Sequence, residues 1–199
     1  MDIVLSSVSQ GLLWSIMAIG VFLTFRILDI ADLSAEGSFP MGAAVCALMI
    51  INGYHPILAT FGGMLGGMAA GAVSGFMHTK MKIPALLTGI ITLTGLYSVN
   101  LLILGRSNVS LSGETTLVTL LTDTGLTKTT AVLIIGAIFV ALVVLSLVVL
   151  LNTQLGLALR ATGDNLEMGE ANGIKVDRMK ILGYMLSNGL IALSGALLA

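Results

Sequence analysis

Charged side chains are scarce in this sequence. Only 10% of its 199 residues are Asp, Glu, Lys or Arg, whereas a soluble domain usually carries about 25%. So few charges cannot cover a water-facing surface, which excludes an ordinary cytosolic enzyme and a disordered chain. The net charge is −1, so no basic field is present to attract a nucleic acid, and we expect no nucleic-acid partner.

Groups that could hold a metal or carry out catalysis are equally rare. The single cysteine, Cys46, excludes a disulfide framework and a thiolate metal cage. His55 and His78 stand far apart with no carboxylate or thiol at ligand spacing, so we interpret both as interfacial polar residues. The sequence has no G-x-x-x-x-G-K-[ST] phosphate loop and no nucleophile–base–acid arrangement. We therefore expect no metal site, no cofactor and no enzyme activity within this chain.

Apolar residues are what the sequence has in abundance. They make up 56% of the chain, and the mean hydropathy is +1.05. A transmembrane helix needs about 20 mostly apolar residues. We therefore predict an all-α fold, a polytopic transmembrane helical bundle that forms one domain over residues 1–199, with about five to six membrane segments. The expected segments are residues 8–25, 39–51, 57–77, 83–104 and 130–151, and a sixth that begins near Ile181.

The final segment is still apolar at Ala199 and has no basic flank or polar tail. We therefore expect the chain to be the front part of a longer polypeptide, and the alternative is a short natural chain with a frayed apolar end. An inverted repeat, if one exists, would need the remaining part to become visible.

The placement of basic residues predicts orientation. Six of the nine basic residues lie in two connections, which predicts that both connections are cytoplasmic: Lys80 and Lys82 in one, and Arg160, Lys175, Arg178 and Lys180 in residues 152–180. The stretch 105–128 is rich in Ser, Thr and Gly and is predicted to be the extracytoplasmic loop. If every segment crosses the bilayer, Met1 lies outside, and if one is re-entrant it lies inside.

Small residues repeat every four positions in the third segment, at Gly63, Gly67, Gly71 and Gly75. A second row of small residues runs beside it, at Gly62, Gly66, Ala70 and Ser74. Residues at i and i + 4 share one face of a helix, and small faces let another backbone approach closely. The rows predict tight helix packing within the chain, or else a seam with a second subunit or a wall of a pathway.

Residues 26–42 hold three of the ten acids between two apolar segments, at Asp29, Asp32 and Glu36. Ionisable side chains and irregular backbone are tolerated at membrane depth only beside protein or a water-filled cavity. One hypothesis is therefore that the segment lines a translocation path. The other is a solvated loop that caps the next helix, with Ser38 as N-cap and Pro40 near the first turn.

Residues 152–180 follow an uncharged segment and contain signals for two short helices. We expect the first over residues 155–161, closed by Gly163, and the second over residues 166–172, with Gly173 as the residue that ends it.

Asp164 is the expected N-cap of the second helix, because Glu167 follows three positions later as in a capping box. Leu166, Met168 and Ala171 would give this helix a small apolar face. Two stiff, capped helices outside the membrane make a good contact for another protein, and the alternative is an interfacial loop without a partner.

Two of these stretches resemble motifs of a known family. Residues 156–165 (GLALRATGDN) followed by 171–174 (ANGI) resemble the cytoplasmic motif of ABC-importer permeases of the branched-chain amino acid and sugar type. Residues 32–43 (DLSAEGSFPMGA) resemble the early motif of the same family, in the expected order and separation. The sequence looks closest to the subgroup associated with amino-acid uptake, aromatic amino acids included.

The resemblance implies a membrane-spanning permease subunit of a bacterial inner-membrane importer, which pairs with a second copy around a central pathway. It implies cytoplasmic ABC ATPase subunits, an extracytoplasmic solute-binding protein that delivers a small solute, here an amino acid, and a surrounding lipid bilayer. Residues implied in contact with the ATPase are Arg160, Gly163, Asp164, Asn165, Glu167, Ala171 and Gly173. Residues implied along the pathway are Asp32, Ser34, Glu36, Gly37, Ser38, Pro40 and Gly42.

The resemblance implies two or more further helices after the coupling motif, whereas only the segment that begins near Ile181 follows it in this sequence. Two other functions compete with an importer. An ion-coupled secondary transporter would place coupling acids within its helices, and a membrane scaffold would dock a cytosolic partner through residues 152–180.

Overall fold

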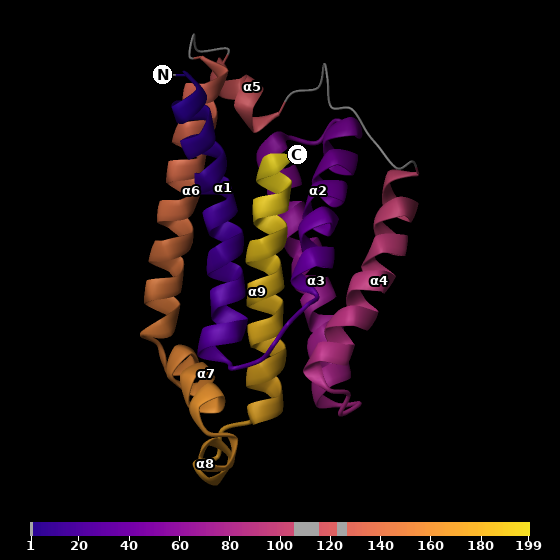
Figure 1. Ribbon diagram of the computed structural model, residues 1–199, viewed down its shortest axis with the longest axis vertical. Coiled ribbons are helices and arrows are strands. Elements are labelled where there is room, and N and C mark those ends of the chain that lie inside the picture. Colours follow the sequence, from indigo (N-terminus) through magenta and orange to yellow (C-terminus); the bar gives the residue numbers. More distant parts are fainter. Residues whose placement is uncertain (1, 106–115, 123–126) are drawn as a thin grey trace.

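The computed structural model describes residues 2–105, 116–122 and 127–199, and within these ranges the chain is helical with no β-strand (Figure 1). The helices are α1 (Asp2–Phe22), η1 (Leu23–Ile27), α2 (Ala35–Ile51), α3 (Pro56–Thr79), α4 (Ala85–Leu104), α5 (Leu117–Thr122), α6 (Lys128–Leu151), α7 (Gln154–Asp164), α8 (Leu166–Ala171) and α9 (Val176–Leu198). Most of the expected loop 105–128 lies outside the described residues. The prediction of a polytopic helical bundle is confirmed.

Five helices in the described ranges are long and apolar enough to cross a membrane, namely α1 continued by η1, α3, α4, α6 and α9, whereas α2 is shorter. Helix α9 is the central one, because it packs against α1, α2 and α3 and is the most buried of the five spans. Helix α6 lies outside α1, and α4 lies outside α2 and α3 (Figure 1).

The glycine row of α3 faces α9. A methyl group added at Gly67 would overlap the carbonyl oxygen of Asn188, and one added at Gly75 would lie 2.9 Å from the Cα atom of Ile181. The row therefore lets two backbones meet inside the chain and is not available as a seam with a second subunit. The second row faces α2 and α4, and in it the Ser74 hydroxyl donates to Thr92 Oγ1 at 3.0 Å.

The connection between α1 and α2 turns back into the bundle. Helix α1 ends in the π-helical turn η1, Asp29 adopts a positive φ of 54°, and the chain then rises to the start of α2 (Figure 1). Ser34 and Ser38 both approach Asn188 of α9. Because Asn188 lies near the middle of the 23-residue α9, α2 begins about halfway along the bundle.

The expected N-cap at Ser38 is wrong, since α2 already begins at Ala35 and Ser38 lies inside it. The physical reason is the Asp32 side chain, whose Oδ1 accepts the backbone N–H of Ser34 at 2.8 Å and closes a tight turn ahead of the expected start. Pro40 consequently lies inside α2 and not near its first turn.

The two basic connections lie at one end of the bundle, and the start of α1 lies at the other (Figure 1). An ion pair of 3.0 Å between Lys80 Nζ and Asp177 Oδ2 joins these two connections. Because α2 is shorter than a span and begins about halfway along the bundle, this arrangement does not require every segment to cross the bilayer in full. If the positive-inside rule holds, the end that carries α7 and α8 is cytoplasmic.

Candidate functional site

The two short helices of the predicted coupling segment form a hairpin at one end of the bundle. Helix α7 continues through Gly163 to Asp164, further than expected, and α8 follows after a single residue. That residue, Asn165, is extended and its Oδ1 accepts the N–H of Met168 at 3.0 Å. The expected N-cap at Asp164 is therefore wrong, because Asp164 still belongs to α7 and the adjacent Asn165 supplies the cap.

Gly173 ends α8 as expected. It has φ of 79°, a conformation that favours glycine. Its N–H donates to the Glu170 carbonyl at 2.9 Å, and the next N–H, of Ile174, donates to the Gly169 carbonyl at 3.1 Å. This pairing satisfies the last carbonyl groups of the helix and fixes the direction in which the chain returns to α9.

The cap at Asn165 gives a first prediction. Replacing Asn165 with Ala should destabilise α8 by about 0.5–2 kcal/mol, because one N-terminal N–H loses its acceptor. Hydrogen exchange of the α8 amides, followed by mass spectrometry, should become faster. Asp164→Ala is the matched control and should leave this exchange unchanged, and equal acceleration by both variants would contradict the assignment of the cap.

Six of the seven residues implied in ATPase contact are exposed, namely Arg160, Asp164, Asn165, Glu167, Ala171 and Gly173. The apolar side chains of Leu166 and Met168 lie among them and are 43% and 66% exposed. We call this surface of α7 and α8 the knuckle. It offers charges of both signs around an apolar centre.

Gly163, the seventh residue, faces the other way. A methyl group at this position would overlap the carbonyl oxygen of Ile27 and lie 3.0 Å from the Cα atom of Leu28. On the same side of α7, Leu159 is buried in a core that contains Leu28 and Tyr184. The knuckle is therefore attached directly to the π-helical turn at the end of α1.

The chain that leaves this turn enters a buried polar network. Asp32 is 2% exposed, while Ser34, Ser38 and Asn188 are fully buried. Asn188 Nδ2 donates to Asp32 Oδ2 at 2.9 Å and to the Tyr184 carbonyl at 3.0 Å, and its Oδ1 accepts from Ser38 at 2.5 Å. The Ser34 hydroxyl lies 2.5 Å from Asp32 Oδ1. The amide of Asn188 thus joins the α1–α2 connection, α2 and α9.

In the structure, the seven residues implied along the pathway fall into three groups. Asp32, Ser34 and Ser38 belong to the buried network. Gly37 and Gly42 lie at helix contacts, against Leu93 of α4 and Ala192 of α9. Only Glu36 and Pro40 are exposed, on one face of α2.

Sequence reasoning missed Asn188. The available signal was a lone amide in an otherwise apolar segment, because such a group must find partners inside the bundle.

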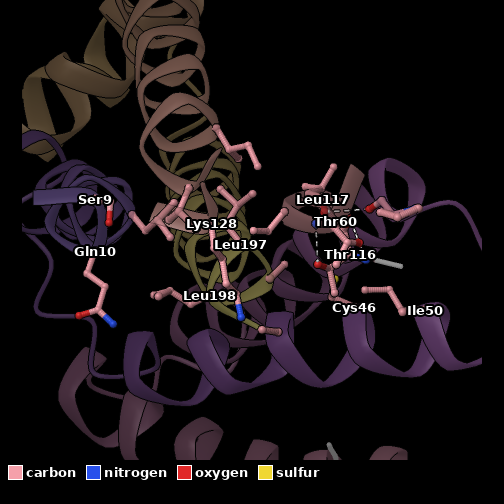
Figure 2. A pocket seen from close by; sticks show the side chains of 18 of the residues that line it. Ser9, Gln10, Cys46, Ile50, Thr60, Thr116, Leu117, Lys128, Leu197 and Leu198 are labelled. Carbon is pink, nitrogen blue, oxygen red and sulfur yellow. Dashed lines mark hydrogen bonds between the residues drawn. The ribbon is translucent and has the colours of Figure 1, made fainter. Parts of the chain in front are cut away.

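A cavity of about 750 Å³ lies at the end of the bundle opposite to the knuckle. Figure 2 shows its wall, with Ser9 and Gln10 from α1, Thr60 from α3, and Lys128 from α6. Leu198 and Ala199 also line it. The polar groups of this wall are mainly hydroxyls, which suit a hydrated space.

The chain is similar to known transport proteins. A family model described as the branched-chain amino acid transport system permease component matches residues 3–199. The chain is 42% identical over 203 residues to a tyrosine transport system permease protein of Clostridioides difficile, covering 98% of the chain and 64% of that protein. It is 36% identical to an uncharacterized protein, RP368, of Rickettsia prowazekii, covering all of the chain and 68% of that protein.

A more distant relative is the autoinducer 2 import system permease protein LsrC of Salmonella typhimurium, which is 28% identical and of which the chain covers 55%. No solved structure matches the chain. The chain thus spans less than two thirds of the tyrosine and autoinducer permeases. Since the family model matches nearly every residue, the chain belongs to the permease family of the branched-chain amino acid transport systems.

Proposed function

We propose that this chain is part of the membrane-spanning permease subunit of an ATP-driven ABC importer for a small solute of the amino-acid class. The observation that carries the proposal is the exposed knuckle, packed through Gly163 on the end of a membrane helix. The Clostridioides difficile relative is named as a tyrosine transport system permease, which supports the solute class. Because the sequence has no phosphate loop, ATP would be hydrolysed by a partner.

The partners follow from the same proposal. Two copies of the permease would enclose a central pathway in the inner membrane of a bacterium, each with a cytoplasmic ABC ATPase on its knuckle. A solute-binding protein would deliver the solute at the opposite end. The mixed charges and apolar centre of the knuckle suit a protein partner that presents a groove.

In the proposed mechanism, the contact between α7 and the π-helical turn transmits the movement of the ATPase to the membrane helices. When ATP closes the ATPase pair, α7 moves and carries Ile27 and Leu28 with it, because Gly163 leaves no free space between them. The displaced chain continues within four residues to Asp32 and so to Asn188 and the start of α2. ATP shifts the equilibrium between inward- and outward-facing states only by its differential affinity for them. In this proposal Glu36 and Pro40 border the pathway, and the buried network positions them.

Arg160 provides the test. In the full-length permease reconstituted with its ATPase and binding protein, Arg160→Ala should lower the stimulated ATPase activity about tenfold, because the knuckle loses its charged contact with the ATPase. The affinity of the binding protein for its solute should not change. Lys175→Ala, which removes an exposed cation of the same loop outside the motif, is the matched control.

Full stimulation with Arg160→Ala would remove the case for the knuckle as the coupling element. Uptake driven by a proton or sodium gradient without any ATPase would replace the importer by a secondary transporter. Copurification with a partner that is not an ATPase would favour a scaffold.

A further inference from the structure

One exposed face of the bundle combines an acid with two aromatic rings. Glu36 and Phe39 are one helical turn apart in α2, and Trp14 of α1 stacks on Phe39 with 5.2 Å between ring centroids and 18° between ring planes. Glu36 is exposed, and Trp14 is 51% exposed. We call Glu36, Phe39 and Trp14 the midplane face.

The midplane face lies near the centre of the membrane. Trp14 is close to the middle of the span Ile3–Ile27. Ser34 and Ser38 flank Glu36 in sequence, and both reach Asn188 in the middle of α9. Glu36 therefore lies at about the same depth as Trp14, far from both ends of the bundle.

Neither exposed side chain suits lipid at this depth. Tryptophan is enriched at the membrane–water interfaces and not at the centre. An ionisable group at the centre is costly and usually faces a bundle interior or a water-filled cavity. Among the described residues the recorded ion pair is Lys80–Asp177, so Glu36 has no cationic partner there. The face is therefore built for something other than acyl chains.

The chemistry of the face favours a cation. Pro40 has no N–H, so the carbonyl oxygen of Glu36 receives no helical hydrogen bond from position i + 4. Ring faces of Trp and Phe attract cations. Beside the face, the N-terminus of α2 already has the carboxyl group of Asp32 against it, whose Oδ1 accepts the Ser34 N–H.

We propose that the midplane face binds the ammonium group of the transported solute, with Glu36 as acceptor and the free ring face of Trp14 as the cation–π partner, while Phe39 stacks on the other face of Trp14. This inference rests on the proposed function. It goes further by naming the chemical group of the solute, the ammonium, that the permease itself recognises. An ammonium has three donors and no acceptor, which matches a face that presents acceptors and ring faces. The carboxylate of an amino acid finds no cation on this face.

Transport gives the first test. In proteoliposomes that contain the full-length permease, its ATPase and its binding protein, Glu36→Gln should lower labelled tyrosine uptake per ATP hydrolysed about tenfold. Trp14→Leu should lower it several-fold, and Trp14→Phe should restore most of it. Phe22→Leu is the matched control, because Phe22 is 54% exposed on the same helix but outside the face. Unchanged uptake with Glu36→Gln overturns the inference.

Charged thiol reagents give a test that does not depend on delivery of the solute by the binding protein. In the full complex with Cys46→Ala, the change Ala43→Cys places a thiol two turns from Glu36 along α2. A cationic methanethiosulfonate should react faster than an anionic one, and Glu36→Gln should lower this preference about tenfold. Tyramine should slow the cationic reagent, whereas 3-(4-hydroxyphenyl)propionate, which lacks the amine, should not.

Equal rates for both reagents, no reaction with either, or equal protection by both solutes would overturn the ammonium site. These outcomes leave the importer standing if the unmodified complex still takes up tyrosine with ATP. If that complex shows no ATP-dependent uptake at all, the proposed function itself fails. The two failures are therefore distinguishable.

Discussion

Replacing Asn188 with Asp should prevent the full-length permease from accumulating in its folded form. Asn188 Nδ2 donates to Asp32 Oδ2 and to the Tyr184 carbonyl, and an Asp side chain brings no N–H to replace these donors. Instead it sets a second carboxyl group against Asp32 in a buried site, since both positions are 2% exposed or less. Leaving a buried hydrogen-bonding group without its partner costs about 1–3 kcal/mol, and more when the group is charged, which is a large part of a total stability of about 5–15 kcal/mol.

The measurement is the monodisperse fraction of the detergent-solubilised permease on size-exclusion chromatography, together with its melting temperature. Exchange of the two groups, Asp32→Asn with Asn188→Asp, restores one amide opposite one carboxyl group and should recover part of the loss. Ser38→Ala removes a single neutral hydrogen bond and should cost only about 1 kcal/mol. If Asn188→Asp melts like the parent, the network does not hold α2 against α9.

The helices themselves were predictable because their signals are local. A long apolar run must form its hydrogen bonds internally in a membrane, so its length alone identifies it. Gly173 was predictable for the same kind of reason, since a glycine after a short amphipathic run suits a left-handed C-terminal residue. The expected bounds of α4 and α6 differ from the observed ones by only two residues, at the start of each helix.

The start of α2 and the role of Asn188 were not predictable in this way. Ser38 reads locally as an N-cap, yet its partner lies 150 positions away on α9, and no local pattern encodes that pairing. The prediction of Asp164 as N-cap failed for a related reason. Both can cap a helix, and the decision depends on how far α7 continues past Gly163, where α7 packs against Ile27.

Gly163→Ala should disrupt the transmission of movement between the ATPase and the membrane helices. The added methyl group would overlap the carbonyl oxygen of Ile27 and lie 3.0 Å from the Cα atom of Leu28. Both are backbone atoms, so they cannot move aside as a flexible side chain can, and α7 must shift away from the π-helical turn. Alanine favours a helix over glycine by about 1 kcal/mol, so the defect cannot come from unfolding of α7. We expect binding-protein-stimulated ATPase activity and uptake to fall more than tenfold.

The matched control is Gly169→Ala in α8, where the nearest atom to the new methyl group is Val176 Cγ2 at an ordinary contact distance of 3.5 Å. That variant gains the same helix preference without displacing the knuckle, so it should retain stimulation. Copurification of the ATPase with both variants separates lost transmission from lost docking. A Gly163→Ala complex that assembles and still transports at the parental rate would show that force reaches the pathway by another route, for example through the α7–α9 contact. Loss of transport with the ATPase still bound would place the transmitting contact at Ile27, which lies five residues before Asp32 and eight before the start of α2.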